Sequence, residues 1–288
     1  MASAEPVAWV LNLDAEDELV HPGAHTPTAV LKARVEAFLP KLAGLILPGD
    51  QIIWPGDQSV DPSLIGRAWC PTRWALSQME RAGVRLPRAP SMEVLRRVNH
   101  RRFCHELGQT LPGAGYADNA AQVAALLVGE CLLKRPLGYA GRGRRKLRGG
   151  EVSDVDQAWI DASLRDGDGL QVEPFVQREV DCALHGWLDE DGSCRWGEPT
   201  EQVVDANGAW VSTRVAASLT AQELEALNGE GRRTASALHA AGYFGPFGVD
   251  AFRWRDSSGL TRFQPRCEIN ARYSMGWAVG MGGFRPLR

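Results

Sequence analysis

The sequence predicts a protein of the mixed α/β (α+β) class, and three features lead to that prediction. Its 288 residues can bury a sizeable core, and 44% hydrophobic with 23% charged residues is typical of soluble globular proteins. Short apolar runs alternate with helical patterns early in the chain, which indicates an α/β lobe. Turn residues separate neighbouring apolar runs in the second half, which indicates antiparallel hairpins.

The first part of the chain predicts alternating strands and helices. Apolar runs at 7–13 and 51–54 end in polar or turn residues, so each indicates a short strand. Apolar positions recur at helical spacing over 28–45, and a further helix is expected over 71–82, before Gly83. No Gly-x-Gly-x-x-Gly follows the first strand, so the dinucleotide-binding fingerprint is absent there.

The remaining elements prepare a second, antiparallel region. Helices are expected over 99–107, 119–129 and 220–241, and strands over 131–134, 169–176, 179–187, 194–196, 247–254 and 261–269. Thr220 and Glu223 form the pattern of a capping box for the last of these helices. We expect Gly229 and Gly231 to interrupt that helix.

Charge and composition exclude several classes of protein. The net charge is −3 and the pI is about 6.1, so the chain is not built to coat nucleic acid or an anionic membrane. Apolar runs stay shorter than the roughly 20 residues that a bilayer crossing needs. The six cysteines lack Cys-x-x-Cys spacing and the first residues lack a secretory pattern, so we expect reduced thiols and a cytoplasmic location.

A basic, glycine-rich segment is the first candidate for chemistry. Seven basic residues and no acid lie between Cys131 and Gly150. Lys134 ends a predicted strand, and the glycines that follow would let backbone N–H groups approach a polyphosphate: Gly138, Gly141 and Gly143. The segment is not a P-loop. A flexible surface hairpin and a nucleic-acid contact remain alternative interpretations.

Two further groups of residues point to a nucleotide and its metal ion. Asp250, Glu268 and Asn270 lie on two strands whose antiparallel pairing would bring their oxygens together, as Mg²⁺ prefers. A strand with Glu173, Phe175, Val176 and Glu179 could present backbone groups to a purine and carboxylates to ribose hydroxyls. Solvated acids on exposed strands are the alternative in both cases.

In this order and spacing, these three groups make residues 95–288 resemble the ATP-grasp superfamily, of the carboxylate–amine or peptide ligase type. The resemblance implies a small lobe at 96–172 with the phosphate loop and a large lobe at 173–288 with the metal site. Together the two lobes would clasp ATP, and a small α/β domain at 1–95 would precede them in the chain. Where the family usually has Asp-Lys, the aligned stretch of this chain is Asn99-His100-Arg101-Arg102, so the resemblance implies that Arg101 contacts phosphate, with Arg102 as the close competitor.

The resemblance also implies a reaction and its participants. A carboxylate would attack the γ-phosphate of ATP, with Mg²⁺ (or Mn²⁺) as cofactor, and an amine would then displace phosphate from the acyl phosphate to form an amide or peptide bond. Lys134 and Arg272 would be catalytic. The expected partners are ATP and small-molecule carboxylate and amine substrates, such as an amino acid or short peptide, without nucleic acid or membrane; a homodimer is considered because many relatives are dimers. A non-catalytic ATP-binding protein and a phosphotransferase are the alternatives.

Overall fold

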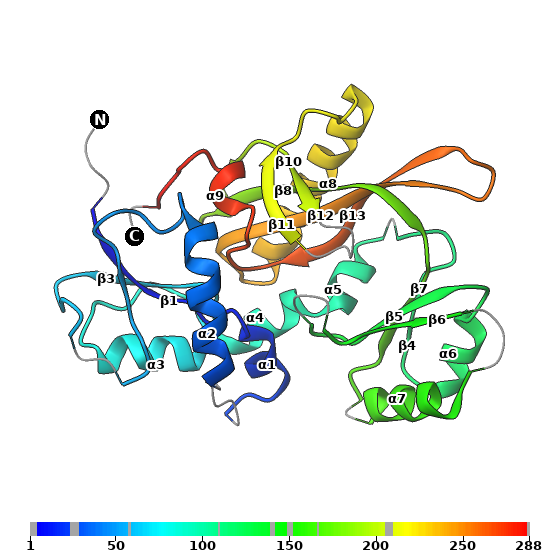
Figure 1. Cartoon of the computed structure of the whole chain (residues 1–288), viewed down its shortest axis with the longest axis horizontal. Coiled ribbons are helices and arrows are strands. Elements are labelled where there is room, and N and C mark those ends of the chain that lie inside the picture. The colour runs from blue at the N-terminus through cyan, green and yellow to red at the C-terminus, as the bar shows by residue number, and fades with distance from the viewer. Residues whose placement is uncertain are drawn as a thin grey trace.

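The computed structural model describes residues 5–23, 29–56, 59–108, 110–138, 142–148, 152–165, 167–204 and 210–286. These residues form three sheets with their covering helices, side by side along the long axis of the molecule (Figure 1). The N-terminal lobe lies at the left, the largest sheet at the top and the small antiparallel sheet at the right. Within the described part of the chain, no helix is long and apolar enough to span a membrane.

The N-terminal lobe contains a parallel sheet in the order β2-β1-β3. β1 is apolar on both faces and wholly buried, because helices cover it from both sides. β3 is missed by the periodicity argument: it lacks alternation, and Gly66 within it is required because a Cβ there would meet Met79 Sδ at 2.6 Å. The lobe consists of β1 (Val7–Val10), α1 (Ala15–Val20), α2 (Ala29–Phe38), the 3₁₀ helix η1 (Leu39–Leu42), β2 (Gln51–Ile52), β3 (Ile65–Ala68) and α3 (Arg73–Arg81).

Two short helices lead from this lobe to the small antiparallel sheet, whose order is β4-β7-β5-β6. Leu133 and Val172, from its two central strands, pack under the helices that cover one face, while the other face is left for polar side chains. The elements are α4 (Met92–Asn99), α5 (Arg101–Glu106), β4 (Gly115–Ala117), α6 (Ala120–Leu126), β5 (Cys131–Lys134), β6 (Arg144–Leu147), α7 (Asp154–Leu164) and β7 (Leu170–Pro174).

The large sheet runs in the order β11-β10-β8-β12-β13, with β9 paired to β8, and all its pairings are antiparallel. The predicted strands at 179–187, 247–254 and 261–269 are confirmed and extended, and the 194–196 hairpin strand is confirmed. The elements are β8 (Gln177–Leu188), β9 (Cys194–Trp196), β10 (Thr200–Val204), β11 (Trp210–Val215), α8 (Ala221–Ala240), β12 (Gly245–Arg255), β13 (Thr261–Asn270) and α9 (Trp277–Gly280).

Helix α8 confirms one local prediction and corrects another. The capping box is present, with Thr220 accepting from the Glu223 backbone and Glu223 accepting from that of Thr220. The predicted interruption at Gly229 and Gly231 is wrong. The helix runs through both glycines because its apolar side packs on the large sheet, which outweighs their low helix propensity.

The N-terminal lobe and the large sheet share one hydrophobic core. Trp9 of β1 meets Tyr273, just beyond β13, with ring centroids 5.1 Å apart, and Tyr273 meets Trp277 at 4.8 Å. Phe247 of β12 belongs to the same buried cluster. The predicted domain boundaries after residues 95 and 172 stay predictions; β7 runs across the second of them.

Candidate active site

The predicted phosphate-binding lysine lies at the end of β5, inside a buried ion pair. Lys134 shares its sheet face with Glu173 of β7, because Leu133 and Val172 between them turn to the helix-covered face. Lys134 Nζ lies 2.5 Å from Glu173 Oε1, and the two side chains are only 3% and 6% exposed. The predicted phosphate-binding lysine and Glu173, the first of the predicted nucleotide-contacting carboxylates, therefore meet on the face away from α6 and α7.

The loop after β5 is shaped by glycine, as the sequence suggested. A Cβ on Gly138 would meet the carbonyl oxygen of Arg142 at 2.7 Å, and Gly143 has a φ of +69°. Backbone N–H of Arg135 donates to Gly143 O at 2.8 Å, which closes the β5–β6 hairpin. Gly141 lies outside the described residues. The basic segment therefore contains a strand, β6, that pairs with β5, in addition to the glycine-rich residues before it.

Arg101 opens α5 beneath this loop and reaches the large sheet. Its backbone N–H donates to Pro136 O at 2.9 Å and its Nε donates to Arg135 O at 3.1 Å. Its guanidinium lies 2.9 Å from Glu268 Oε2 and is buried. Arg102 turns away and stacks on Tyr116, 4.2 Å from the ring centre. The geometry therefore favours Arg101 over Arg102 for a contact within the site.

The predicted metal ligands are neighbours on β12 and β13. Asp250 and Glu268 are register partners, and Asn270 Nδ2 donates to Asp250 Oδ2 at 3.0 Å. Burial and the nearby Glu268 raise the pKa of Asp250. Burial opposes ionisation of Glu268 too, but Arg101 and Lys134 outweigh it and lower the pKa of Glu268. Two half-buried carboxylates that repel one another fit a divalent cation, which would relieve that repulsion.

Among the described residues, no cluster of three or more His, Cys, Asp or Glu side chains could hold a metal ion. The predicted set has two carboxylates, and its third member is the amide of Asn270. An amide oxygen is a good ligand for a hard cation. The set is thus one that suits Mg²⁺, which keeps several waters and takes the remaining ligands from substrate phosphates.

Arg272 follows β13 and binds an acid of the N-terminal lobe. Its Nε donates to Glu16 Oε1 at 2.6 Å, and its NH1 donates to Tyr273 O at 3.0 Å. Both side chains are buried, and Glu16 Oε2 has no hydrogen-bond partner. Burial works against the charge of Arg272, but Glu16 outweighs it and raises the Arg272 pKa. The predicted catalytic arginine is therefore held by a residue that sequence reasoning missed.

The other residues predicted to contact the purine or the ribose lie at or near the surface, Phe175 and Val176 between β7 and β8 and Glu179 within β8. Phe175 is 42% exposed and lies under Lys146, whose Nζ is 3.3 Å from the ring centre. Its backbone N–H donates to Glu130 O. Val176 is half-buried, and Glu179 accepts from Arg255 Nε at 2.9 Å. Glu173 is therefore brought into the site, whereas Glu179 is engaged with Arg255.

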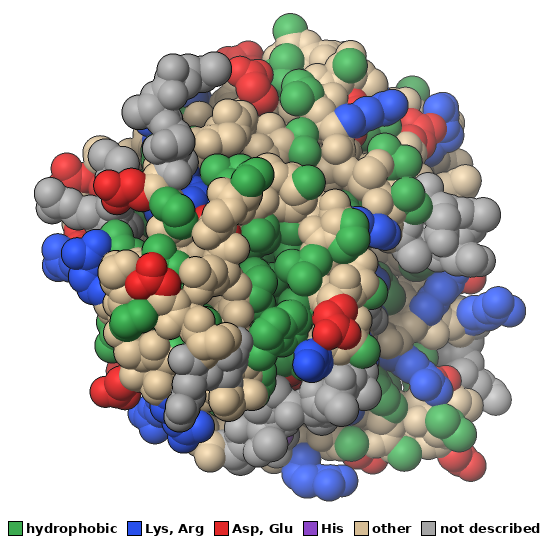
Figure 2. Space-filling view, turned by 60° about the vertical axis from the view of Figure 1, so that its left-hand side comes forward, with side chains coloured by type: hydrophobic (Ala, Val, Ile, Leu, Met, Phe, Trp, Pro, Cys, Tyr) green, Lys and Arg blue, Asp and Glu red, His purple; other side chains and the backbone are tan. Residues whose placement is uncertain are grey.

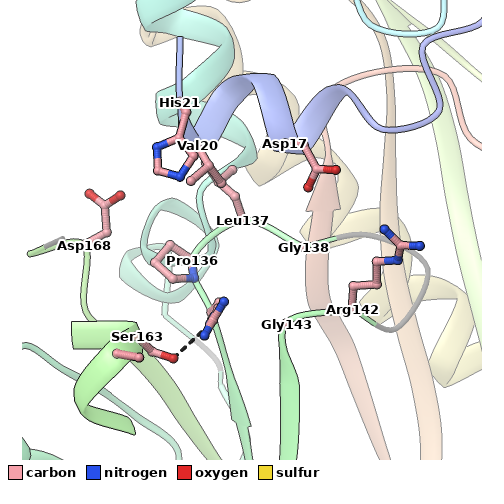
Figure 3. A pocket seen from close by; sticks show the side chains of 12 residues that line it. Asp17, Val20, His21, Pro136, Leu137, Gly138, Arg142, Gly143, Ser163 and Asp168 are labelled. Carbon is pink, nitrogen blue, oxygen red and sulfur yellow. Dashed lines mark hydrogen bonds between the residues drawn. The ribbon is translucent and has the colours of Figure 1, made fainter. Parts of the chain in front are cut away.

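A pocket of about 340 Å³ lies between α1 and the glycine-rich loop (Figure 3). Asp17 belongs to α1 and His21 follows its last residue, and Gly138 and Gly143 come from the loop below them. Arg135 also lines the pocket, and its Nε donates to Ser163 Oγ at 2.8 Å. The N-terminal lobe therefore borders the predicted phosphate loop. The one signal in the sequence was the acidic run after the first predicted strand. That run does not identify the segment it would face, so sequence reasoning missed this contact.

No protein-family model matches this sequence, and no curated protein matches it either. Solved structures do match. Pyruvate carboxylase T882A from Rhizobium etli aligns with 96% of this chain, at 16% sequence identity and a TM-score of 0.56. Biotin carboxylase from Campylobacter jejuni, solved as a β-γ-ATP complex, aligns with 96% of this chain, at 13% identity and a TM-score of 0.55. D-alanyl-alanine synthetase A from Vibrio cholerae aligns with 94% of this chain, at 12% identity and a TM-score of 0.55. The chain spans 27%, 71% and 90% of those chains, respectively.

Proposed function

From the ATP-grasp fold, which this chain shares with those structures, we propose that the protein is an ATP-dependent ligase that joins a carboxylate to an amine. The predicted fold is confirmed. The reaction is proposed to pass through an acyl phosphate, to release ADP and phosphate, and to form an amide or peptide bond on an amino acid or short peptide. Lysine, arginine and carboxylate groups that converge between the small and large sheets support this function.

One observation carries the proposal: the contact between Arg101 and Glu268, beside Lys134. These residues come from α5, β13 and β5, and Arg101 and Glu268 lie 2.9 Å apart. Lys134 is close enough to help lower the pKa of Glu268. Phosphoryl transfer needs this combination, because the protein must position phosphates with fixed cations and hold a divalent ion with carboxylates.

ATP would bind by exchanging the partners of two buried cations. Lys134 turns from Glu173, and Arg101 turns from Glu268, toward phosphate oxygens that carry more charge than either carboxylate. Glu173 is then free to accept hydrogen bonds from nucleotide hydroxyls or amines. Backbone N–H groups of the Gly138–Gly143 loop add neutral donors to the phosphates.

Asp250, Glu268 and the Asn270 amide oxygen would hold Mg²⁺, with Mn²⁺ as an alternative ion. When bound, the ion supplies positive charge next to the phosphates and screens the charge that moves in the transfer. Arg272 follows Asn270 directly after β13 and stabilises the acyl phosphate. Glu16 keeps the Arg272 guanidinium in place, and the 273–276 turn adds backbone donors.

The experiment measures ADP and phosphate release from Mg²⁺-ATP across a panel of amino acids and short peptides. Amide product in equal amount to ADP supports the proposal, and Lys134→Ala and Glu268→Gln should each lose most of the turnover. Lys41→Ala and Glu190→Gln are matched controls; Lys41 contacts Trp210 and Glu190 pairs with Arg88, both outside the site. Both controls should keep full activity.

Other outcomes separate the competing functions. Nucleotide binding without turnover in every mixture would favour a regulatory ATP-binding protein, and a stable phosphorylated acceptor would identify a phosphotransferase. Release of AMP and pyrophosphate would exclude the acyl-phosphate route. The identity of the substrates, the homodimer and the cytoplasmic location stay predictions.

A further inference from the structure

A second pocket lies in the N-terminal lobe, away from the glycine-rich loop. It has a volume of about 250 Å³. Figure 2 brings this side of the molecule forward and shows hydrophobic side chains gathered in a hollow with charged side chains around it. The pocket is lined by Val10, Leu11, Leu31, Lys32, Val35, Ile52, Ile53, Trp54, Pro55 and Trp74.

The pocket lies where parallel sheets usually bind ligands. Val10 and Leu11 are the end of β1 and the residue after it, and Ile52 and Ile53 stand in the same place on β2. The crevice outside the carboxyl ends of parallel strands is the general ligand position in α/β sheets. The side chains there include the half-buried indoles of Trp54 and Trp74, each packed at the edge of a hydrophobic core cluster.

The pocket is also linked through helix α1 to the candidate active site. The backbone N–H of Trp74, on the pocket wall, donates to Glu18 Oε1 at 2.9 Å. Glu18 belongs to α1, as does Glu16, which binds Arg272. A residue of the pocket wall is therefore hydrogen-bonded to the same short helix that holds the predicted catalytic arginine.

The chemistry of the wall specifies the ligand. Of the described residues that line the pocket, Lys32 alone is charged, and its Nζ lies 5.4 Å from the ring centre of Trp54. Its ion pair with Glu36 is a 4.0 Å contact between side chains that are more than half exposed. Such a pair is weak, so a carboxylate on a ligand can replace Glu36. Aromatic and aliphatic walls with one cation at the rim suit an apolar ring that carries a negative charge.

We propose that this pocket binds a small aromatic carboxylate, with the ring between Trp54 and Trp74 and the carboxylate at Lys32. The proposal goes beyond the ligase activity and does not depend on it. Its test uses no ATP and no turnover, so failure of either proposal leaves the other standing.

The test is a saturation-transfer NMR titration of the full chain with three probes: phenylacetate, phenethylamine and acetate. Phenylacetate should bind about tenfold to a hundredfold tighter than acetate, because burial of the ring supplies most of the affinity. It should bind about twofold to fivefold tighter than phenethylamine, because the amine meets Lys32 with like charge. Phenylacetate that binds no tighter than acetate would overturn the proposal.

Variants locate the binding. Trp54→Ala should weaken phenylacetate about tenfold or more, and Lys32→Gln should remove the preference for acid over amine. Lys41→Gln is the matched control, because Lys41 also lies over a tryptophan but outside the pocket, 5.2 Å from the Trp210 ring centre. If Trp54→Ala fails to fold, Ile52→Phe narrows the pocket instead and should give the same loss. An unchanged preference in Lys32→Gln, or a lost one in Lys41→Gln, would refute the assigned position.

Discussion

Replacing Lys134 by methionine tests whether the buried ion pair of β5 and β7 belongs to a nucleotide site. The two charged atoms are 2.5 Å apart and nearly inaccessible, so Lys134→Met leaves the Glu173 carboxylate buried without its cation. Removing one partner of a buried pair costs about 3–5 kcal/mol, a large part of a total stability of about 5–15 kcal/mol. The double variant Lys134→Met/Glu173→Gln removes both charges and should recover most of that loss.

Urea unfolding with and without ADP separates the structural effect from the functional one. ADP at a hundred times its Kd should raise the free energy of unfolding of the wild-type chain by about 2.7 kcal/mol. The double variant should fold almost as stably as wild type, yet gain little from ADP, because the phosphate-binding cation is gone. A double variant that still gains the full amount from ADP would refute the role of Lys134. A single variant as stable as wild type would refute the buried pair.

Three further predictions concern stability, each measured by urea unfolding. In α8, a Cβ on Gly229 meets nothing within 4 Å, so Gly229→Ala should raise the free energy of unfolding by about 0.5–1 kcal/mol. A Cβ on Gly231 meets the buried Leu184 at 2.6 Å, so Gly231→Ala should lower the free energy of unfolding by about 1–3 kcal/mol. A stabilising Gly231→Ala together with a destabilising Gly229→Ala would refute this packing. Burial lowers the pKa of His185 to about 4, so the unfolded chain takes up a proton on this residue at a higher pH than the folded chain does. The free energy of unfolding should therefore fall by up to about 1.4 kcal/mol per pH unit as the pH falls from 6.5 to 4, a slope that His185→Gln should lose. Arg266→Met removes the buried cation 2.9 Å from Glu230 and leaves that buried carboxylate only its 3.5 Å contact with the half-exposed Arg233, so it should cost about 3–5 kcal/mol; an unchanged midpoint would show that the 2.9 Å pair is not needed.

The proximity of the three predicted metal ligands could be predicted because its signal is local. Asp250, Glu268 and Asn270 lie on two strands joined by a tight turn, so strand periodicity and a single antiparallel register fix their proximity. The same reasoning predicted Lys134 on a strand that precedes a glycine-rich loop. Each inference required only near neighbours in sequence and one rule of backbone geometry.

Contacts between distant parts of the chain could not be predicted in this way. Glu16 and Arg272 are 256 positions apart, and nothing in the acidic run around Glu16 distinguishes it from a solvated helix start. β3 was missed because it lacks alternation, whereas α4 was missed although Ser91 caps it and Leu95 and Val98 are buried on one face. Glu179, predicted to contact the nucleotide, pairs instead with Arg255 on the neighbouring strand β12, a contact that depends on the strand register.

The three ion pairs of the candidate site are better explained by function than by stability. Lys134–Glu173, Arg101–Glu268 and Arg272–Glu16 all have side chains that are buried or largely so. Burying two charges costs several kcal/mol per ion, and apolar residues of similar size often stabilise a fold equally well or better. A fold selected for stability alone gains little from three such pairs in one region. A site that must exchange these carboxylates for phosphate oxygens needs the cations in place beforehand, and their carboxylate partners hold them there until the nucleotide binds.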